Sequence, residues 1–167
     1  MNMTTYILAE NPSHYLEIET LANIIWREHY IPIVGKAQVD YMLDKFQSAE
    51  AIQNQVNNDY LYYMVSYNNT AVGYFAILKE TKSLFLSKFY ILSDFRNKGI
   101  GKKTMEFIEA KALAFQLNKI RLTVNINNTN AIIAYEKFGF KKIGPLVADI
   151  GSGFVMDDYE MVLGVKN

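Results

Sequence analysis

The stretch that decides the fold is Arg96-Asn97-Lys98-Gly99-Ile100-Gly101, which is followed by two lysines. It joins a predicted β-strand over residues 83–92 to a predicted amphipathic helix over residues 101–117. A helix N-terminus carries unpaired N–H groups and a partial positive charge, and Gly99 and Gly101 let a ligand come close to the backbone. The stretch therefore predicts a binding site for an anion such as a phosphate; a plain glycine turn with solvated lysines is the alternative.

Two other phosphate-binding motifs are excluded by the same residues. A dinucleotide-binding loop requires a third glycine at the position of Thr104. A nucleotide P-loop requires Gly-Lys-Ser/Thr after a longer spacer, and this spacing is missing from the stretch.

The pattern of apolar residues around the loop predicts one α+β domain that covers residues 1–167. A first strand precedes a helix that begins at Asn11-Pro12, and Pro32 helps to end that helix. Asn68-Asn69-Thr70 suits a tight hairpin. The resulting sheet is expected to be mostly antiparallel. The remaining predicted elements are helices over 38–46, 48–56 and 129–138, and strands over 60–67, 71–79, 119–125, 140–147 and 154–163.

A second motif lies downstream, between Asn128 and Phe140. From the residues alone it is a helix that Asn128 caps and Gly139 ends, in which Tyr135 is a half-buried core aromatic.

The two motifs together resemble those of the GNAT superfamily of N-acetyltransferases. The family loop is Arg/Gln-x-x-Gly-x-Gly/Ala and its second motif is Asn-x-x-Ala-x-x-x-Tyr-x-x-x-Gly-Phe; every fixed position is present between Leu84 and Phe140. The resemblance implies a single domain with a twisted, mostly antiparallel sheet of about seven strands, flanked by helices and splayed between the fourth and fifth strands. It also implies acetyl-CoA-dependent transfer of an acetyl group directly to an amine in a ternary complex.

Particular roles follow from the resemblance. Tyr135 would protonate the departing sulfur, because a phenol with a pKa of about 10 is protonated at neutral pH. A backbone N–H near Ile91 would stabilise the negative charge on the carbonyl oxygen. Backbone amides of the loop would cradle the pyrophosphate of coenzyme A, and the preceding strand and Asn128 would bind its pantetheine arm or 3′-side. The residues implied in cofactor binding are Phe89, Tyr90, Ile91, Arg96, Asn97, Lys98, Gly99, Ile100, Gly101, Lys102 and Asn128.

The acceptor amine is predicted to bind near the segment 26–43, where the family is variable. Trp26, Glu28 and His29 offer aromatic and acidic groups that suit an ammonium ion, and Glu28 and His29 are candidate general bases, with water as the alternative. A solvated helix end is the other interpretation of Glu28 and His29. Residues 26–30 and 157–160 are similar to the bacterial polyamine N-acetyltransferases, which implies a polyamine-like acceptor. A peptide N-terminus or a lysine is the alternative.

Two non-enzymatic functions are also open, an acetyl-CoA sensor without turnover and an interaction module. The presence of Tyr135 disfavours the sensor, and the intact loop over residues 96–101 disfavours the module.

Amino-acid composition further limits the functional classes to which the protein could belong. Lys plus Arg and Asp plus Glu both number 17, which does not suit a general nucleic-acid binder, although residues 61–148 are rich in basic groups and both ends are rich in acidic ones. The uneven charge is either chance or an anion site in the middle and a cation site near the ends. The chain has no cysteine, so it has neither a thiol nucleophile nor a thiolate metal site. Without a long apolar stretch or the pattern of a signal peptide, we expect a cytoplasmic protein with no membrane contact and no metal; a homodimer is left open.

Overall fold

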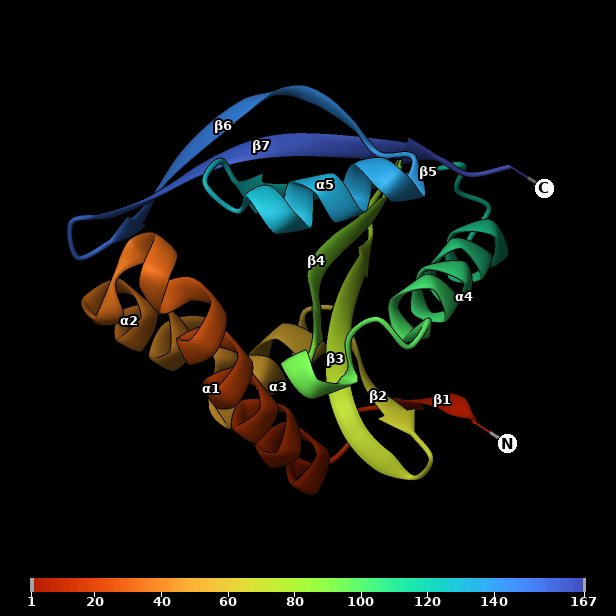
Figure 1. Ribbon diagram of the computed structural model, residues 1–167, viewed down its shortest axis with the longest axis horizontal. Coiled ribbons are helices and arrows are strands. Elements are labelled where there is room, and N and C mark those ends of the chain that lie inside the picture. The colour runs from red at the N-terminus through yellow and green to blue at the C-terminus, as the bar shows by residue number, and fades with distance from the viewer. Residues whose placement is uncertain (1, 167) are drawn as a thin grey trace. The chain divides into compact units, whose positions relative to one another are not determined.

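The structure is a computed structural model that describes residues 2–166. Within that range seven strands form one sheet in the order β1-β2-β3-β4-β5-β7-β6 (Figure 1). The strands are β1 (Thr4–Leu8), β2 (Leu61–Tyr67), β3 (Thr70–Lys79), β4 (Leu84–Ile91), β5 (Lys119–Asn125), β6 (Lys141–Gly151) and β7 (Phe154–Gly164). The helices are α1 (Pro12–Val34), α2 (Lys36–Gln47), α3 (Ala49–Asn57), α4 (Ile100–Ala114) and α5 (Thr129–Phe138), with a 3-10 turn η1 (Ser93–Phe95).

The chain divides into two compact units, which are described one at a time. The first consists of the described residues up to Leu78 together with Lys88–Met105. The second consists of Lys79–Ser87 and the described residues from Glu106 onward. Strand β4 and helix α4 therefore each contribute residues to both units.

In the first unit, β1, β2 and β3 are antiparallel neighbours, and the helices α1–α3 pack on one another. Asn68 and Asn69 both have positive φ values, 51° and 67°, which a two-residue hairpin turn of type I′ requires. The hairpin predicted from these two asparagines is therefore confirmed.

Helix α1 is longer than the sequence predicts. It starts as expected, with the Asn11 side chain accepting a hydrogen bond from the His14 N–H, but it continues through Pro32 to Val34. The expectation that Pro32 helps to end the helix is wrong. A proline removes one helical N–H without forcing an end. The break comes at Gly35, whose φ of 89° is one that glycine readily adopts.

In the second unit, β7 pairs antiparallel with both β5 and β6, and β6 extends to Gly151 rather than ending at the predicted residue 147. Parallel pairing joins Leu84 to Ile120 and Phe85 to Arg121, at the start of β4. Pairing of this kind, confined to the first residues of the strand, is what a splay between the fourth and fifth strands produces. The predicted fold class is confirmed.

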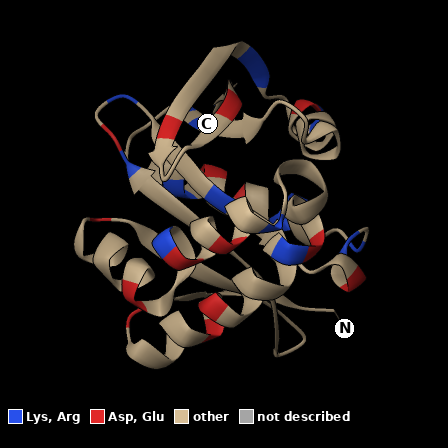
Figure 2. Ribbon diagram, turned by 90° about the vertical axis from the view of Figure 1, so that its left-hand side faces the viewer, with Lys and Arg blue, Asp and Glu red and all other residues tan. Residues whose placement is uncertain are grey.

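Charged residues of both signs are spread along the ribbon rather than gathered on one element (Figure 2). No helix within residues 2–166 is both long enough and apolar enough to cross a membrane.

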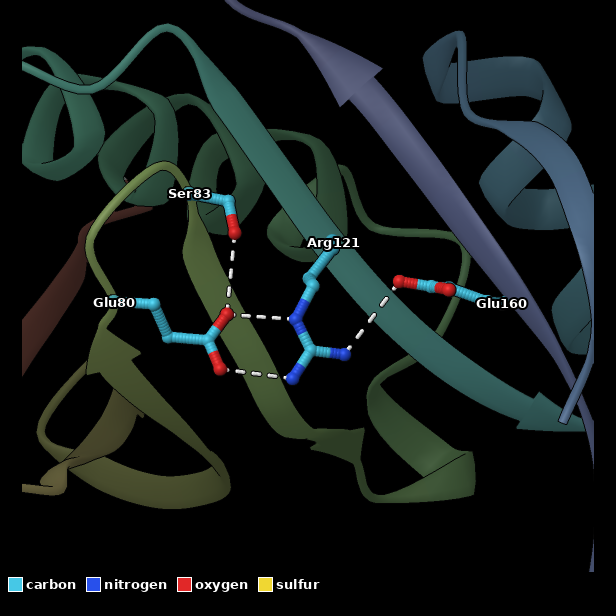
Figure 3. A network of polar contacts seen from close by, with 4 residues as sticks. All are labelled: Glu80, Ser83, Arg121 and Glu160. Carbon is cyan, nitrogen blue, oxygen red and sulfur yellow. Dashed lines mark hydrogen bonds and ion pairs between the residues drawn. The ribbon is translucent and has the colours of Figure 1, made fainter. Parts of the chain in front are cut away.

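An arginine between two carboxylates ties several segments of the second unit together (Figure 3). The Arg121 guanidinium donates to both Glu80 oxygens, at 2.6 and 2.8 Å, and lies 3.6 Å from a Glu160 oxygen. Ser83 donates a third hydrogen bond to Glu80 at 3.1 Å, and the Phe85 ring lies under the guanidinium at 4.2 Å. The hydrogen bond from Arg121 lowers the pKa of Glu80. The network holds the β3–β4 turn against β5 and β7.

We expect Glu80→Gln to lower the free energy of unfolding by about 1–2 kcal/mol at pH 7, because it weakens a charge-assisted pair that is only partly exposed. The folded-state pKa of Glu80 lies below its unfolded value, so its contribution is present above the unfolded pKa and is lost as the pH falls through the folded pKa. The difference from wild type should therefore shrink as the pH is lowered below about 4. Urea denaturation at pH 7 and pH 3 measures this difference in the free energy of unfolding. Glu136→Gln, at an exposed position of α5, is the control, and an equal effect in both variants would contradict the assignment.

Candidate active site

The predicted anion loop follows β4 through the turn η1 and enters α4. Asn97 and Gly99 have positive φ values, 61° and 80°, so the backbone is in the left-handed region at two positions before the helix. Ile100 is 2% exposed and fixes the start of α4 in the core, whereas residues 96–99 are exposed. Loops in which residues alternate in handedness orient successive N–H groups toward one concave side, where they bind anions.

Helix α4 begins with donors available. Its first hydrogen bond is that of the Lys103 N–H to the Gly99 carbonyl, so the N–H groups of Ile100, Gly101 and Lys102 precede the helical ladder. A Cβ added to Gly101 would meet no atom within 4 Å, which leaves the backbone open to a ligand. Four exposed basic side chains surround this end of the helix: Arg96, Lys98, Lys102 and Lys103. The geometry and the charge both suit a phosphate group.

The end of β4 presents its backbone in two directions. The Leu92 N–H donates to the Val72 carbonyl on β3 at 2.8 Å. Because successive residues of a strand direct their polar groups to opposite sides, Ile91 points its N–H and C=O away from β3. The Ile91 carbonyl accepts a hydrogen bond from the Arg96 Nε at 3.2 Å, which agrees with this direction. The predicted oxyanion donor is thus on the side of β4 that β3 does not occupy.

The predicted acceptor residues of α1 belong to a cluster of rings. Trp26 is 2% exposed, and its ring contacts the rings of Tyr30 and Tyr90 edge to face at 5.2 and 5.6 Å. The hydroxyl groups of Tyr30 and Tyr90 lie 3.0 Å apart, and the His29 ring lies 4.8 Å from that of Tyr30. Trp26 is therefore a support for the rings around it, while Tyr30, Tyr90 and His29 are half-buried. Tyr90, predicted for its main chain, also contributes its side chain here.

Charges at the end of α1 are partly neutralised. Arg27 and Lys36 both bind the Asp40 carboxylate, at 2.6 and 2.8 Å, and these hydrogen bonds, with that of Lys36 the larger, lower the pKa of Asp40. Glu28 is exposed and takes part in neither pair.

Sequence reasoning missed a buried hydrogen-bonded chain that supports Trp26. The Trp26 indole N–H donates to the Tyr74 hydroxyl at 3.0 Å, Tyr74 donates to Gln47 at 2.6 Å, and Gln47 donates to the Tyr62 hydroxyl at 3.1 Å. Tyr62, in turn, donates to Gln55 at 2.6 Å. Burial raises the pKa values of Tyr62 and Tyr74, so both phenols stay protonated and hold α1 in place. No local pattern signals this chain, because its members come from five different elements.

The second predicted motif orients a tyrosine through the end of α5. Gly139 adopts the left-handed conformation, with φ of 107°, and its N–H donates to the Glu136 carbonyl while the Phe140 N–H donates to the Tyr135 carbonyl. This is a Schellman motif, which brings the side chains of Tyr135 and Phe140 together, with ring centroids 5.5 Å apart. Phe140 is buried, so the half-exposed Tyr135 ring is held by a fixed neighbour.

Asn128 stands at the N-cap position of α5, where a helix-capping role is the interpretation from the residues alone. Its side chain makes no capping hydrogen bond there. The amide is nevertheless 3% exposed. Its burial has another cause than helix capping.

The structure thus gathers the loop, the end of β4 and the aromatic cluster in the first unit. Asn128 and Tyr135 belong to the second unit, as do the acidic residues in the middle of β7. Of these, Asp158 is 4% exposed, Asp157 is exposed, and Glu160 pairs with Arg121. In the part of the chain that the structure describes, no three His, Asp or Glu side chains gather to hold a metal ion.

Comparison with known proteins identifies the class to which this fold and loop belong. The Acetyltransferase (GNAT) family matches residues 18–140, which is most of the chain, so the chain belongs to this family. The resemblance expected from the two motifs is confirmed.

A curated relative matches part of the chain. Residues of this chain are 34% identical over 64 positions to the spermine/spermidine N(1)-acetyltransferase of Bacillus subtilis, a match that covers 38% of this chain and 42% of that protein. The chain thus matches about two fifths of the length of that relative. A likeness to polyamine acetyltransferases is thus confirmed, while the part of residues 26–30 and 157–160 in it stays a prediction.

Solved structures share the fold at low sequence identity. The PaiA N-acetyltransferase of Thermoplasma acidophilum, solved in complex with coenzyme A, has a TM-score of 0.77 and 20% identity over 96% of this chain and 99% of that one. The ribosomal-protein-S18-alanine N-acetyltransferase of Escherichia coli has a TM-score of 0.73 and 16% identity over 99% of this chain and 96% of that one.

Proposed function

We propose that this protein is an acetyl-CoA-dependent N-acetyltransferase and that residues 1–167 act as one domain. The observation that carries the proposal is the loop over residues 96–101, which has positive φ values at Asn97 and Gly99 and opens the N-terminus of α4 in a chain of the GNAT family. The family match over 18–140 includes parts of both units, which supports a single functional domain. A cytoplasmic location, where acetyl-CoA is available, belongs to the same proposal.

Coenzyme A fits the residues present. The exposed basic groups and the N–H groups at the start of α4 would hold the pyrophosphate, and the open space at Gly101 would admit it. The main chain of Phe89, Tyr90 and Ile91 would hold the pantetheine arm, and Asn128 would contribute from the position just before α5. A relative of the same fold was solved with coenzyme A, which supports the assignment.

Bound acetyl-CoA supplies an acetyl group on a thioester, a good acyl donor. The acceptor nitrogen forms a bond to the carbonyl carbon and loses a proton, the carbon–sulfur bond breaks, and the sulfur takes up a proton. The Ile91 N–H is suited to stabilise the carbonyl oxygen, because it is directed away from β3. Tyr135 would give its proton to the sulfur. With no cysteine in the chain, an acetyl-cysteine intermediate is excluded, which favours direct transfer.

The acceptor in this proposal is a polyamine-like amine that binds near the end of α1. Half-buried rings at Tyr30 and Tyr90 offer cation–π contacts, and the exposed Glu28 offers a carboxylate that could also take the proton. Trp26 would act through the rings it supports, and His29 would line the same site. The similarity to a spermine/spermidine acetyltransferase supports this acceptor, and a peptide α-amine or a lysine is the second candidate.

Gly101→Val tests the loop. Its Cβ meets no protein atom and its φ is not in the left-handed region, so the substitution should leave the fold intact and crowd only the ligand. We expect the affinity for acetyl-CoA to fall at least about tenfold, or about 1.4 kcal/mol, by calorimetry. Gly164→Val, also free of close neighbours, is the control for the cost of a branched side chain. Equal affinities in both folded variants would refute the loop assignment.

Tyr135→Phe keeps the ring on Phe140 and removes only the phenolic hydroxyl group. We expect kcat to fall by about 10²-fold, with little change in acetyl-CoA binding, if Tyr135 is the general acid. Tyr67→Phe, at a half-buried position in the first unit, is the control. If the Tyr135→Phe enzyme has a near-normal kcat, Tyr135 has only a packing role and water protonates the departing sulfur.

An amine panel that measures free thiol released from acetyl-CoA tests the activity and the acceptor together. Polyamines should react better than neutral-ended amines of equal length, and this preference should weaken with salt, because exposed charges are screened over about 8 Å at physiological ionic strength. Glu28→Gln should raise KM for the polyamine more than it lowers kcat, whereas Glu17→Gln, exposed on the same helix, should change neither. Turnover of a peptide amine but not of polyamines would contradict the proposed polyamine-like acceptor. If no amine is turned over, the proposed acetyltransferase activity is contradicted.

A further inference from the structure

Strand β3 approaches the end of β4 unusually closely at one glycine. A Cβ built on Gly73 would lie 2.2 Å from the Tyr90 carbonyl oxygen, 2.8 Å from the Ile91 Cδ1 and 3.1 Å from the Ile91 Cα. Two of these three atoms are backbone, so a side chain cannot be admitted by a rotamer change alone. Any other residue at this position requires the main chain at Tyr90–Ile91 to move.

A second irregularity of β3 lies beside Gly73. Val65 on β2 pairs with Gly73, while the next residue, Ser66, pairs with Ala71, so Val72 is an extra residue in the β3 side of the ladder. Bulges of this kind bend a strand and redirect its polar groups. The carbonyl of this bulged residue is the one that accepts the Leu92 N–H at 2.8 Å. Leu92 is the first residue beyond β4 and leads directly into η1.

Together the bulge and the glycine determine where β4 ends. Val72 fixes the Leu92 amide by a hydrogen bond, and Gly73 leaves room for the Tyr90 carbonyl to point into β3. The alternation of strand residues then directs the Ile91 N–H to the other side. The Arg96 side chain, bonded to the Ile91 carbonyl, links this arrangement to the start of the loop.

We propose that Gly73, with the bulge at Val72, is a positioning element that sets the β4 backbone at Tyr90–Ile91 for the pantetheine arm and the acetyl group. The inference rests on the proposed function, because it concerns the same cofactor. It assigns no contact between Gly73 and the cofactor; Gly73 acts through the β4 main chain. A shift of that main chain should therefore weaken the contacts with the pantetheine arm and misplace the oxyanion donor. The phosphate loop should still bind the phosphate groups of the cofactor.

Two variants disturb the arrangement by different routes. Gly73→Ala adds the Cβ that the Tyr90 carbonyl excludes. Leu92→Pro removes the N–H that Val72 accepts and puts the ring Cδ in its place, so the Val72 carbonyl must move away, while the φ of −54° and ψ of 141° at Leu92 are ones that proline adopts. Gly144→Ala is the matched control, since it lies in a strand and a Cβ there would meet nothing within 4 Å.

The experiment compares two ligands by calorimetry: coenzyme A, and 3′-phospho-ADP, which is coenzyme A without its pantetheine arm. We expect both Gly73→Ala and Leu92→Pro to lose at least about tenfold in affinity for coenzyme A and less than about twofold for 3′-phospho-ADP. The kcat for acetyl transfer should also fall, since the Ile91 N–H is displaced. Gly144→Ala should match wild type with both ligands. A general loss of structure would weaken the two ligands alike, and unaltered 3′-phospho-ADP binding shows that the variant is folded.

The outcomes separate the proposals. If the affinities for coenzyme A are unchanged, or fall in parallel with those for 3′-phospho-ADP, the positioning role is overturned while the proposed function stands. Should Gly73→Ala not fold, Leu92→Pro decides the matter by the same comparison. A double variant, Gly73→Ala with Ile91→Ala, should stay impaired because the backbone contact remains, and full recovery would overturn the assignment to the backbone. Wild-type protein that binds neither ligand overturns the proposed function and this inference with it.

Discussion

The hydrogen bond from the Leu92 N–H to the Val72 carbonyl is the interaction on which the candidate site depends. Before Leu92 the chain is a strand, and after it the chain turns through η1 into the exposed loop, so this bond determines where the loop begins. At the other end of the loop, Ile100 is buried and fixes the first residue of α4. Between these two points the residues 96–99 are exposed, and their backbone turns through the left-handed conformations of Asn97 and Gly99. The loop is held by its own turn bonds, from the Phe95 N–H to the Leu92 carbonyl and from the Arg96 N–H to the Ser93 carbonyl, and by the buried Ile100. It can therefore keep its donors in one arrangement without a bound ligand, which lowers the cost of binding.

The features that the sequence predicted correctly are local. Two adjacent asparagines adopt φ values of 51° and 67°, and so the hairpin follows from the residues in the turn itself. Likewise the spacing of Tyr135, Gly139 and Phe140 is that of a Schellman motif, in which the glycine ends the helix and the two aromatic residues meet. The physical meaning of the family pattern Tyr-x-x-x-Gly-Phe is therefore that a buried phenylalanine holds the tyrosine ring in place.

The features that the sequence did not predict are long-range. The chain from Trp26 through Tyr74 and Gln47 to Tyr62 joins residues from α1, β3, α2 and β2, and each hydrogen bond in it connects two different elements. Periodicity marks such residues as buried but cannot pair them. Gly73 offered a weak signal, since a glycine inside a predicted strand often marks a bulge or a close approach of backbone. The signal does not reveal which backbone comes close, because the answer depends on the register of β4 against β3. At Pro32 the local signal was strong but misleading, because α1 continues through the proline to Val34.

The tyrosines of the molecule separate into two kinds by their surroundings, and this separation bears on the chemistry. Tyr62 and Tyr74 are buried and hydrogen-bonded to amide and indole groups, and burial raises their pKa values, so that neither can lose a proton near neutral pH. Such phenols specify the position of α1 and are unsuited to proton transfer. Tyr135 is half-exposed, with one side of its ring on Phe140, so solvent or a ligand can reach it. A group that donates a proton in each turnover must be reprotonated from water, which a buried phenol cannot do quickly. Exposure and support by a fixed neighbour, rather than the residue type alone, are what make Tyr135 the better candidate for the acid.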